Sequence, residues 1–69
     1  MSLPQEPRER LLASLRRVDP AAWRAQVGAV LRAYGEVTSA AEALGIRAST
    51  LAAWVEQDRA LRSALADAG

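Results

Sequence analysis

The chain has 69 residues, a formal net charge of +1, and neither Cys nor His. Without Cys there is no disulfide framework and no thiolate nucleophile, and without His the usual general base near pH 7 and the imidazole metal ligand are missing. The sequence contains no run of 18 apolar residues that would span a membrane. We therefore expect a cytoplasmic protein that is not an enzyme and has no cofactor, metal, membrane contact or small-molecule substrate.

Alanine supplies nearly half of the hydrophobic residues, which make up 51% of the chain, and Phe is absent. Because Ala is the best helix former and carries a very small side chain, this composition predicts a single all-α domain whose helices lie close together. The charge is uneven along the chain. Residues 1–35 hold six Arg and three acidic residues, a net +3, whereas residues 36–69 hold three Arg and five acidic residues, a net −2.

Residues 1–6 are expected to form a flexible arm, and Pro7 suits the first position of a helix over residues 8–18. The apolar residues of this helix recur at helical spacing and comprise Leu11, Leu12, Leu15 and Val18. A chain this small gains stability by burying a second apolar face, so we expect these residues to form a homodimer interface.

A second helix is predicted over residues 20–34. Asp19 followed by Pro20 combines an N-cap acid with a proline at the first helical position, and Gly35 suits the residue after the last turn. The apolar stripe of this helix comprises Trp23, Val27, Val30, Leu31 and Tyr34. We expect Trp23, and Trp54 later in the chain, to pack in the core rather than to stack on nucleic-acid bases. Tyr34 is expected to pack in the core with its hydroxyl at the rim.

A short third helix is predicted to begin at Thr38 or Ser39, both of which are good N-caps, and to end at Gly45. Ser39 and Glu42 also have the spacing of a capping box.

A fourth helix is predicted over residues 48–57, followed by Asp58 as the N-cap of a fifth segment that carries Leu61 and Leu65. The alternative is one helix over residues 48–66. We favour the break because the long helix would place Asp58 within the apolar stripe. The expected fold is thus a domain of four to five helices over residues 7–69.

Residues 37–57 have the pattern of a helix-turn-helix. Ala41 leaves room for two helices to cross, and Gly45 tolerates the positive φ that the short turn between them needs. The positions expected to face the interior are Ala40, Leu44, Ile46, Leu51 and Trp54.

This segment resembles the Fis-type helix-turn-helix of bacterial regulators, whose hallmark run is close to G-N-x-T-x-A-A-x-x-L-G-I-x-x-x-T-L. The residues that match are Gly35, Thr38, Ala40, Ala41, Leu44, Gly45, Ile46, Thr50 and Leu51. The end of the fourth helix is also similar to helix-turn-helix segments of phage terminase small subunits and insertion-element proteins. The resemblance implies a small bacterial transcriptional regulator or accessory factor that binds double-stranded DNA, with the fourth helix in the major groove.

The expected DNA-binding residues lie in two groups. The outward face of the fourth helix carries Ser49, Ala52, Ala53 and Glu56, and a phosphate site would be formed by Thr38, Ser39, Arg47 and Thr50. The outward face lacks the Arg, Lys, Asn or Gln that usually read base edges. An alternative is therefore open, in which the same fold is a protein-interaction or dimerisation module without DNA binding. A second question is also open. Four arginines of the first two helices could form a phosphate-contacting surface, or they could lie on ordinary solvated faces; these residues are Arg16, Arg17, Arg24 and Arg32.

Overall fold

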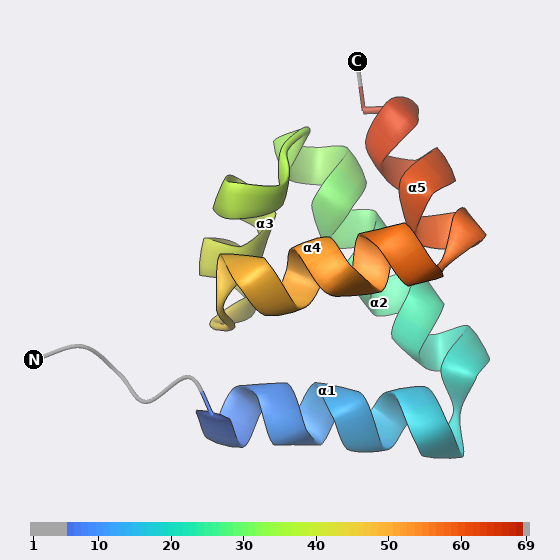
Figure 1. The fold of residues 1–69 in the computed structure, drawn as a ribbon. Helices are drawn as coiled ribbons and strands as arrows, with labels where there is room; N and C mark the ends of the chain where they lie inside the picture. Colours follow the sequence, from blue (N-terminus) through green and yellow to red (C-terminus); the bar gives the residue numbers. More distant parts are fainter. Residues whose placement is uncertain (1–5, 69) are drawn as a thin grey trace, which may run out of the picture.

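The computed structural model describes residues 6–68, and the side chains of residues 7–68. The described residues are all helical or in short turns, with no strand, which confirms the all-α class. The helices are α1 (Glu6–Val18), α2 (Pro20–Tyr34), α3 (Val37–Leu44), α4 (Ala48–Gln57) and α5 (Arg59–Ala66) (Figure 1). Apart from Glu6, which is helical, the expected N-terminal arm lies outside the described residues.

The two ends of α2 form as the sequence predicts. The Asp19 carboxylate accepts a hydrogen bond from the Ala22 N–H at 3.1 Å, and Pro20 occupies the first helical position. At the other end Gly35 has a φ of 75°, and its N–H donates to the Leu31 carbonyl at 2.9 Å. Asp19 and Gly35 therefore set the limits of α2 through hydrogen bonds that span only a few residues.

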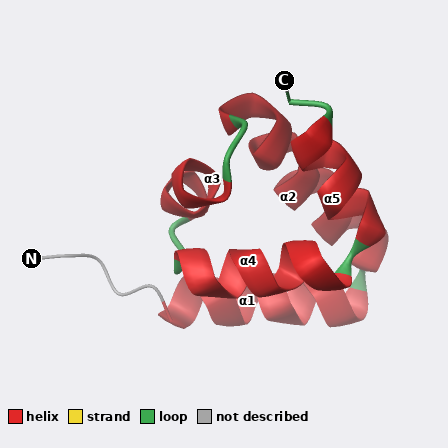
Figure 2. Ribbon diagram, turned by 45° about the horizontal axis from the view of Figure 1, so that its top comes forward, coloured by secondary structure: helices red, strands yellow, loops and turns green. Residues whose placement is uncertain are grey.

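α2 is the central helix of the fold and contacts α1, α3 and α5 (Figures 1 and 2). Its residues Trp23, Val27 and Leu31 are fully buried, and the Trp23 ring meets the Trp54 ring of α4 edge to face at 5.4 Å between centroids. Both tryptophans are core residues, as predicted. The prediction for Tyr34 is wrong, because its side chain is 55% exposed. Tyr34 lies on the same side of α2 as the buried residues, but it is the last residue of the helix and lies at the end of the stripe.

α3 begins earlier than predicted. Its first residue is Val37 and its N-cap is Glu36, so the predicted N-caps Thr38 and Ser39 both lie inside the helix. The Ser39 hydroxyl donates to the Glu36 carboxylate at 2.6 Å, and the predicted capping box with Glu42 does not form. The cause is the short link after α2, since only Gly35 and Glu36 separate the two helices.

A three-residue turn joins α3 to α4, and the two helices meet at a steep angle (Figure 2). Gly45 has a φ of 74°, and the Ile46 N–H donates to the Ala41 carbonyl at 3.0 Å. Of the five residues expected to face the interior, Leu44 is half-buried, and the buried ones are Ala40, Ile46, Leu51 and Trp54.

The break before α5 is also confirmed, because the Asp58 carboxylate caps this helix by accepting from the Ala60 and Leu61 amides at 2.9 and 3.3 Å.

Gly28 and Gly45 differ in the effect on stability that we expect from a change to alanine. Gly45→Ala is expected to destabilise the fold by about 1–2 kcal/mol, because the residue holds a left-handed conformation. Gly28 lies in the interior of α2, and a Cβ there would make an ordinary 3.6 Å contact with the Ala64 Cβ. Gly28→Ala should therefore stabilise the fold by about 0.5–1 kcal/mol. Urea unfolding followed by circular dichroism measures both changes, and a stabilising Gly45→Ala would contradict the assignment of strain.

Candidate functional site

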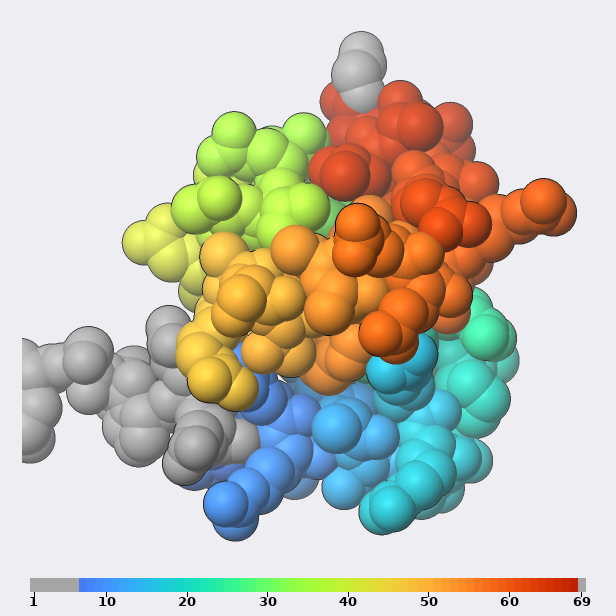
Figure 3. All heavy atoms as spheres, viewed as in Figure 1, coloured from blue at the N-terminus to red at the C-terminus, as the bar shows by residue number. Residues whose placement is uncertain are grey.

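α4 presents one face that no other helix covers, and this face forms the centre of the surface seen in Figure 3. It carries the four residues predicted from helical spacing: Ser49, Ala52 and Glu56 are exposed, and Ala53 is half-buried. We refer to these four residues as the α4 face. It offers two methyl groups, one hydroxyl and one carboxylate, so its own side chains bring no positive charge.

The start of α4 is held by a carboxylate from α1. Glu9 Oε1 accepts hydrogen bonds from the Arg47 N–H at 2.8 Å, from Arg47 Nε at 2.9 Å and from the Thr50 hydroxyl at 3.1 Å. Glu9 Oε2 accepts from Arg47 Nη2 at 2.8 Å. The N-cap residue Arg47 makes no side-chain cap of its own, so Glu9 supplies the anion that a helix N-terminus favours.

These contacts change the electrostatics of the predicted phosphate site. The hydrogen bond from the Arg47 side chain, followed by the one from its backbone N–H, lowers the pKa of Glu9 to about 2 against the opposing effect of burial. Glu9 is therefore ionised at neutral pH. It is also only 8% exposed. Arg47 and Thr50, which we expected to hold a DNA phosphate, instead contact this internal carboxylate.

The other two residues of the predicted phosphate site do not join them. Thr38 is exposed and Ser39 is bonded to Glu36, both in the first turn of α3. α3 has eight residues, so its first turn lies about 12 Å along the helix from the turn that leads to Arg47. The four residues thus do not form one phosphate site in this structure.

Glu9 is the site residue that sequence reasoning missed. It lies 38 residues before Arg47, and no local pattern connects the two. One signal was present: Glu9 precedes the apolar Leu12 by three residues and so lies near the inward side of its helix, where a charge needs a partner.

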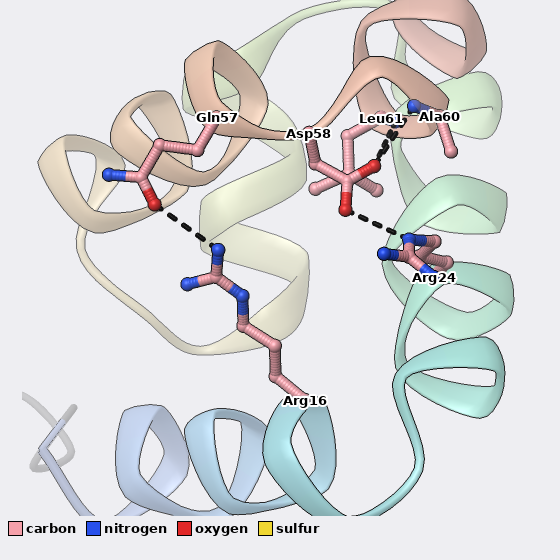
Figure 4. A network of polar contacts seen from close by, with 6 residues as sticks. All are labelled: Arg16, Arg24, Gln57, Asp58, Ala60 and Leu61. Atoms are coloured by element: carbon pink, nitrogen blue, oxygen red, sulfur yellow. Dashed lines mark hydrogen bonds and ion pairs between the residues drawn. The ribbon is translucent and has the colours of Figure 1, made fainter.

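A second contact fixes the other end of α1 to α4. Arg16 Nη2 donates to Gln57 Oε1 at 3.2 Å (Figure 4), and the Arg16 guanidinium lies 5.1 Å from the centre of the Trp23 ring. Glu9 and Arg16 are seven residues apart, or two helical turns, and they contact opposite ends of α4. α1 therefore runs parallel to α4, with Leu12 buried in the core between these contacts (Figure 1).

Arg24 also has a structural role. Its Nε donates to Asp58 Oδ2 at 2.9 Å, while Asp58 Oδ1 accepts from the Ala60 and Leu61 amides (Figure 4). Burial raises the pKa of Asp58, but the hydrogen bonds from Arg24 and from the two amides outweigh it, and the net shift is downward. Of the four arginines considered for a phosphate-contacting surface, Arg16 and Arg24 are thus bonded to other helices of the fold, although Arg24 stays 48% exposed, whereas Arg17 and Arg32 are exposed without such bonds among the described residues.

The predicted dimer residues do not share one surface. Leu12 is buried in the core and Leu15 is half-buried, whereas Leu11 and Val18 are 69% and 80% exposed. Leu12 faces inward because it lies on the side of α1 that carries Glu9 and Arg16. Leu11, Leu12 and Leu15 line an open groove with residues of α2 and α3.

The described residues contain no group of three or more Asp or Glu side chains that could hold a metal ion, and none of the described helices is long and apolar enough to cross a membrane. Comparisons with protein-family models, with curated proteins and with solved structures find no match for this chain.

The Glu9 contacts predict a specific dependence of stability on pH. Because the folded-state pKa of about 2 lies below the ordinary value of 4.5, their contribution is complete above pH 4.5 and is lost as the pH falls toward 2. At pH 6, Glu9→Gln should lower the free energy of unfolding by about 1.5–3 kcal/mol. The difference from the wild type should shrink below pH 4.5, as measured by urea unfolding at each pH.

The control is Glu42→Gln, at an exposed position of α3, which should change stability little at any pH. A difference between wild type and Glu9→Gln that stays constant from pH 6 to pH 2.5 would contradict an ionised Glu9 in the fold.

Proposed function

We propose that this chain is a double-stranded DNA-binding protein in which α3, the turn and α4 act as a helix-turn-helix. The observation that carries the proposal is the uncovered α4 face beside a three-residue turn with a left-handed Gly45. In this arrangement α4 enters the major groove and α3 crosses the backbone. By its resemblance to the Fis-type segment, the protein is proposed to be a small bacterial transcriptional regulator or accessory factor.

The α4 face suits close approach to a groove more than detailed reading of bases. The methyl groups of Ala52 and Ala53 can contact thymine methyls, the Ser49 hydroxyl can bond to a base or a phosphate, and Glu56 can accept from cytosine N4. Arg47 contributes to this function by fixing the start of α4 against Glu9. We therefore expect modest sequence discrimination and an affinity dominated by the phosphate backbone.

A homodimer is part of the proposal. Leu11 and Val18 are large apolar side chains on the exposed side of α1, and they are seven residues apart on one face. Two copies joined through these residues would present two α4 helices to DNA. Successive major-groove half-sites lie about 34 Å apart.

DNA binding is tested by titrating a labelled generic duplex at a series of salt concentrations and measuring fluorescence anisotropy. We expect a Kd tighter than about 10⁻⁴ M at 50 mM salt, with an affinity that falls steeply as salt is added. Weaker binding, or binding that does not depend on salt, would overturn the proposal.

A second candidate function is a protein-interaction module, and the composition of the α4 face favours it. Small uncharged side chains suit close helix–helix packing, and a carboxylate at Glu56 opposes a polyanion. In this role Ala52 and Ala53 would pack against a protein partner or against a second copy. Val55 takes no part in this surface, because it is buried in the core.

Ala53→Arg separates the two functions. If α4 enters the groove, the added guanidinium should tighten duplex binding and steepen the dependence of log K on log salt by about 0.9, as one more phosphate contact does. If α4 packs on a protein, the same change should abolish self-association in light scattering. Ala29→Arg is the matched control, because Ala29 is exposed on α2. A variant that assembles normally and gains no affinity for DNA would contradict both functions.

A further inference from the structure

The α4 face brings no cation to a DNA backbone, so the phosphate contacts of the proposed function must come from another helix. α1 is the candidate because it runs beside α4 and is fixed to both of its ends by Glu9 and Arg16. Figure 3 shows α1 along one edge of the α4 face. Three exposed arginines of α1 are not used in these contacts, Arg8, Arg10 and Arg17. Arg8 lines the groove with Leu12 and Leu15, about 100° around the helix from Glu9 on the side away from the α4 face. Arg10 and Arg17 remain as candidates.

The direction of these two side chains follows from residues whose contacts are known. Leu12 points into the core, and Glu9 and Arg16 point to α4. Arg10 follows Glu9 and Arg17 follows Arg16, so each lies about 100° further around the helix, on the side away from Leu12. Going around α1, the side that faces the core comes first, the side that contacts α4 comes next, and the side that carries Arg10 and Arg17 follows. Both arginines lie where the surface of α1 continues into the α4 face.

Within residues 7–68, no acidic side chain neutralises the charge of this surface. Among residues 7–68, Arg10 and Arg17 form no ion pair or hydrogen bond, and both are exposed. By contrast, the neighbouring Glu9 carboxylate forms an ion pair with the Arg47 guanidinium. On α5, the Arg62 guanidinium donates to the Glu56 backbone carbonyl at the end of α4.

The distances suit a duplex. The major groove is about 12 Å wide, and helices packed side by side lie about 8–10 Å apart. With α4 in the middle of the groove, α1 therefore reaches its edge, where the phosphates lie. Seven residues separate Arg10 from Arg17, which places them about 10 Å apart along the edge.

We propose that Arg10 and Arg17 of α1 are the phosphate-contacting residues of this protein, and that α1 is a backbone-binding helix beside the groove-binding α4. This inference rests on the proposed DNA-binding function and names the residues that supply its affinity. It assigns α1 to the DNA-binding surface through its charged side, while the apolar Leu11 and Val18 occupy another side of the same helix.

The experiment compares the salt dependence of duplex binding for the wild type, for Arg10→Ala/Arg17→Ala and for Arg32→Ala/Arg59→Ala. The control pair removes the same charge from exposed positions on α2 and α5. For the α1 double variant, the slope of log K against log salt should fall in magnitude by about 1.8, since each phosphate contact contributes about 0.9. Affinity at 50 mM salt should fall roughly tenfold or more for every duplex sequence, whereas the control pair should lose much less.

The outcomes separate the two proposals. If the wild type does not bind duplex DNA, the proposed function fails. If the wild type binds but the α1 variant keeps its slope, or if the control pair loses as much, the assignment of Arg10 and Arg17 fails while DNA binding stands. Binding of polyglutamate as tightly as of duplex would assign the two arginines to an acidic protein partner instead. Circular dichroism melts of all three proteins check that the exposed substitutions leave the fold intact.

Discussion

The arrangement of the helices depends on one carboxylate. Glu9 joins the start of α4 to α1 with four hydrogen bonds to Arg47 and Thr50. The same contact supplies the negative charge that the N-terminus of α4 favours. The contact also pairs the Arg47 guanidinium with a carboxylate of the same chain. The Arg47 side chain keeps this contact while remaining 57% exposed.

The core relies on a few large side chains and many small ones. Trp23 and Trp54 meet edge to face, and around them Ala40, Ala41 and Ala64 are almost completely buried. Because these three alanines are small, α3 and α5 can approach the central helix closely. The high alanine content therefore has two different effects. In α3 and α5 it permits close packing, whereas on the α4 face it leaves two positions, Ala52 and Ala53, without a side chain that can form hydrogen bonds.

Local hydrogen bonds explain which parts of the fold were predictable. The limits of α2 and the separate α5 follow from Asp19, Gly35 and Asp58, whose partners lie within four residues. The start of α3 was mispredicted because the length of the link after α2, not the best capping residue, sets it. The exposure of Tyr34 was also missed, because helical spacing places it on the buried side of α2 but does not show that the core ends before the last residue of the helix.

For the candidate site, helical periodicity correctly placed the outward residues of α4 on one face. It could not show that Arg47 and Thr50 are hydrogen-bonded to Glu9, because Glu9 lies on another helix, 38 residues before Arg47 in the sequence. Nor could it show that Leu12 faces the core, since the leucines of α1 are distributed over more than one side of the helix and only the position of α4 selects the buried side.

The pairing of Glu9 with Arg47 has an evolutionary consequence. Loss of either residue alone leaves a charge at the start of α4 without its partner, so a single substitution at either position is disfavoured. Chains descended from the same ancestor should therefore keep both residues or replace both together. Arg10 and Arg17 carry no such internal constraint, and any constancy at those positions would have to come from selection on what the surface binds.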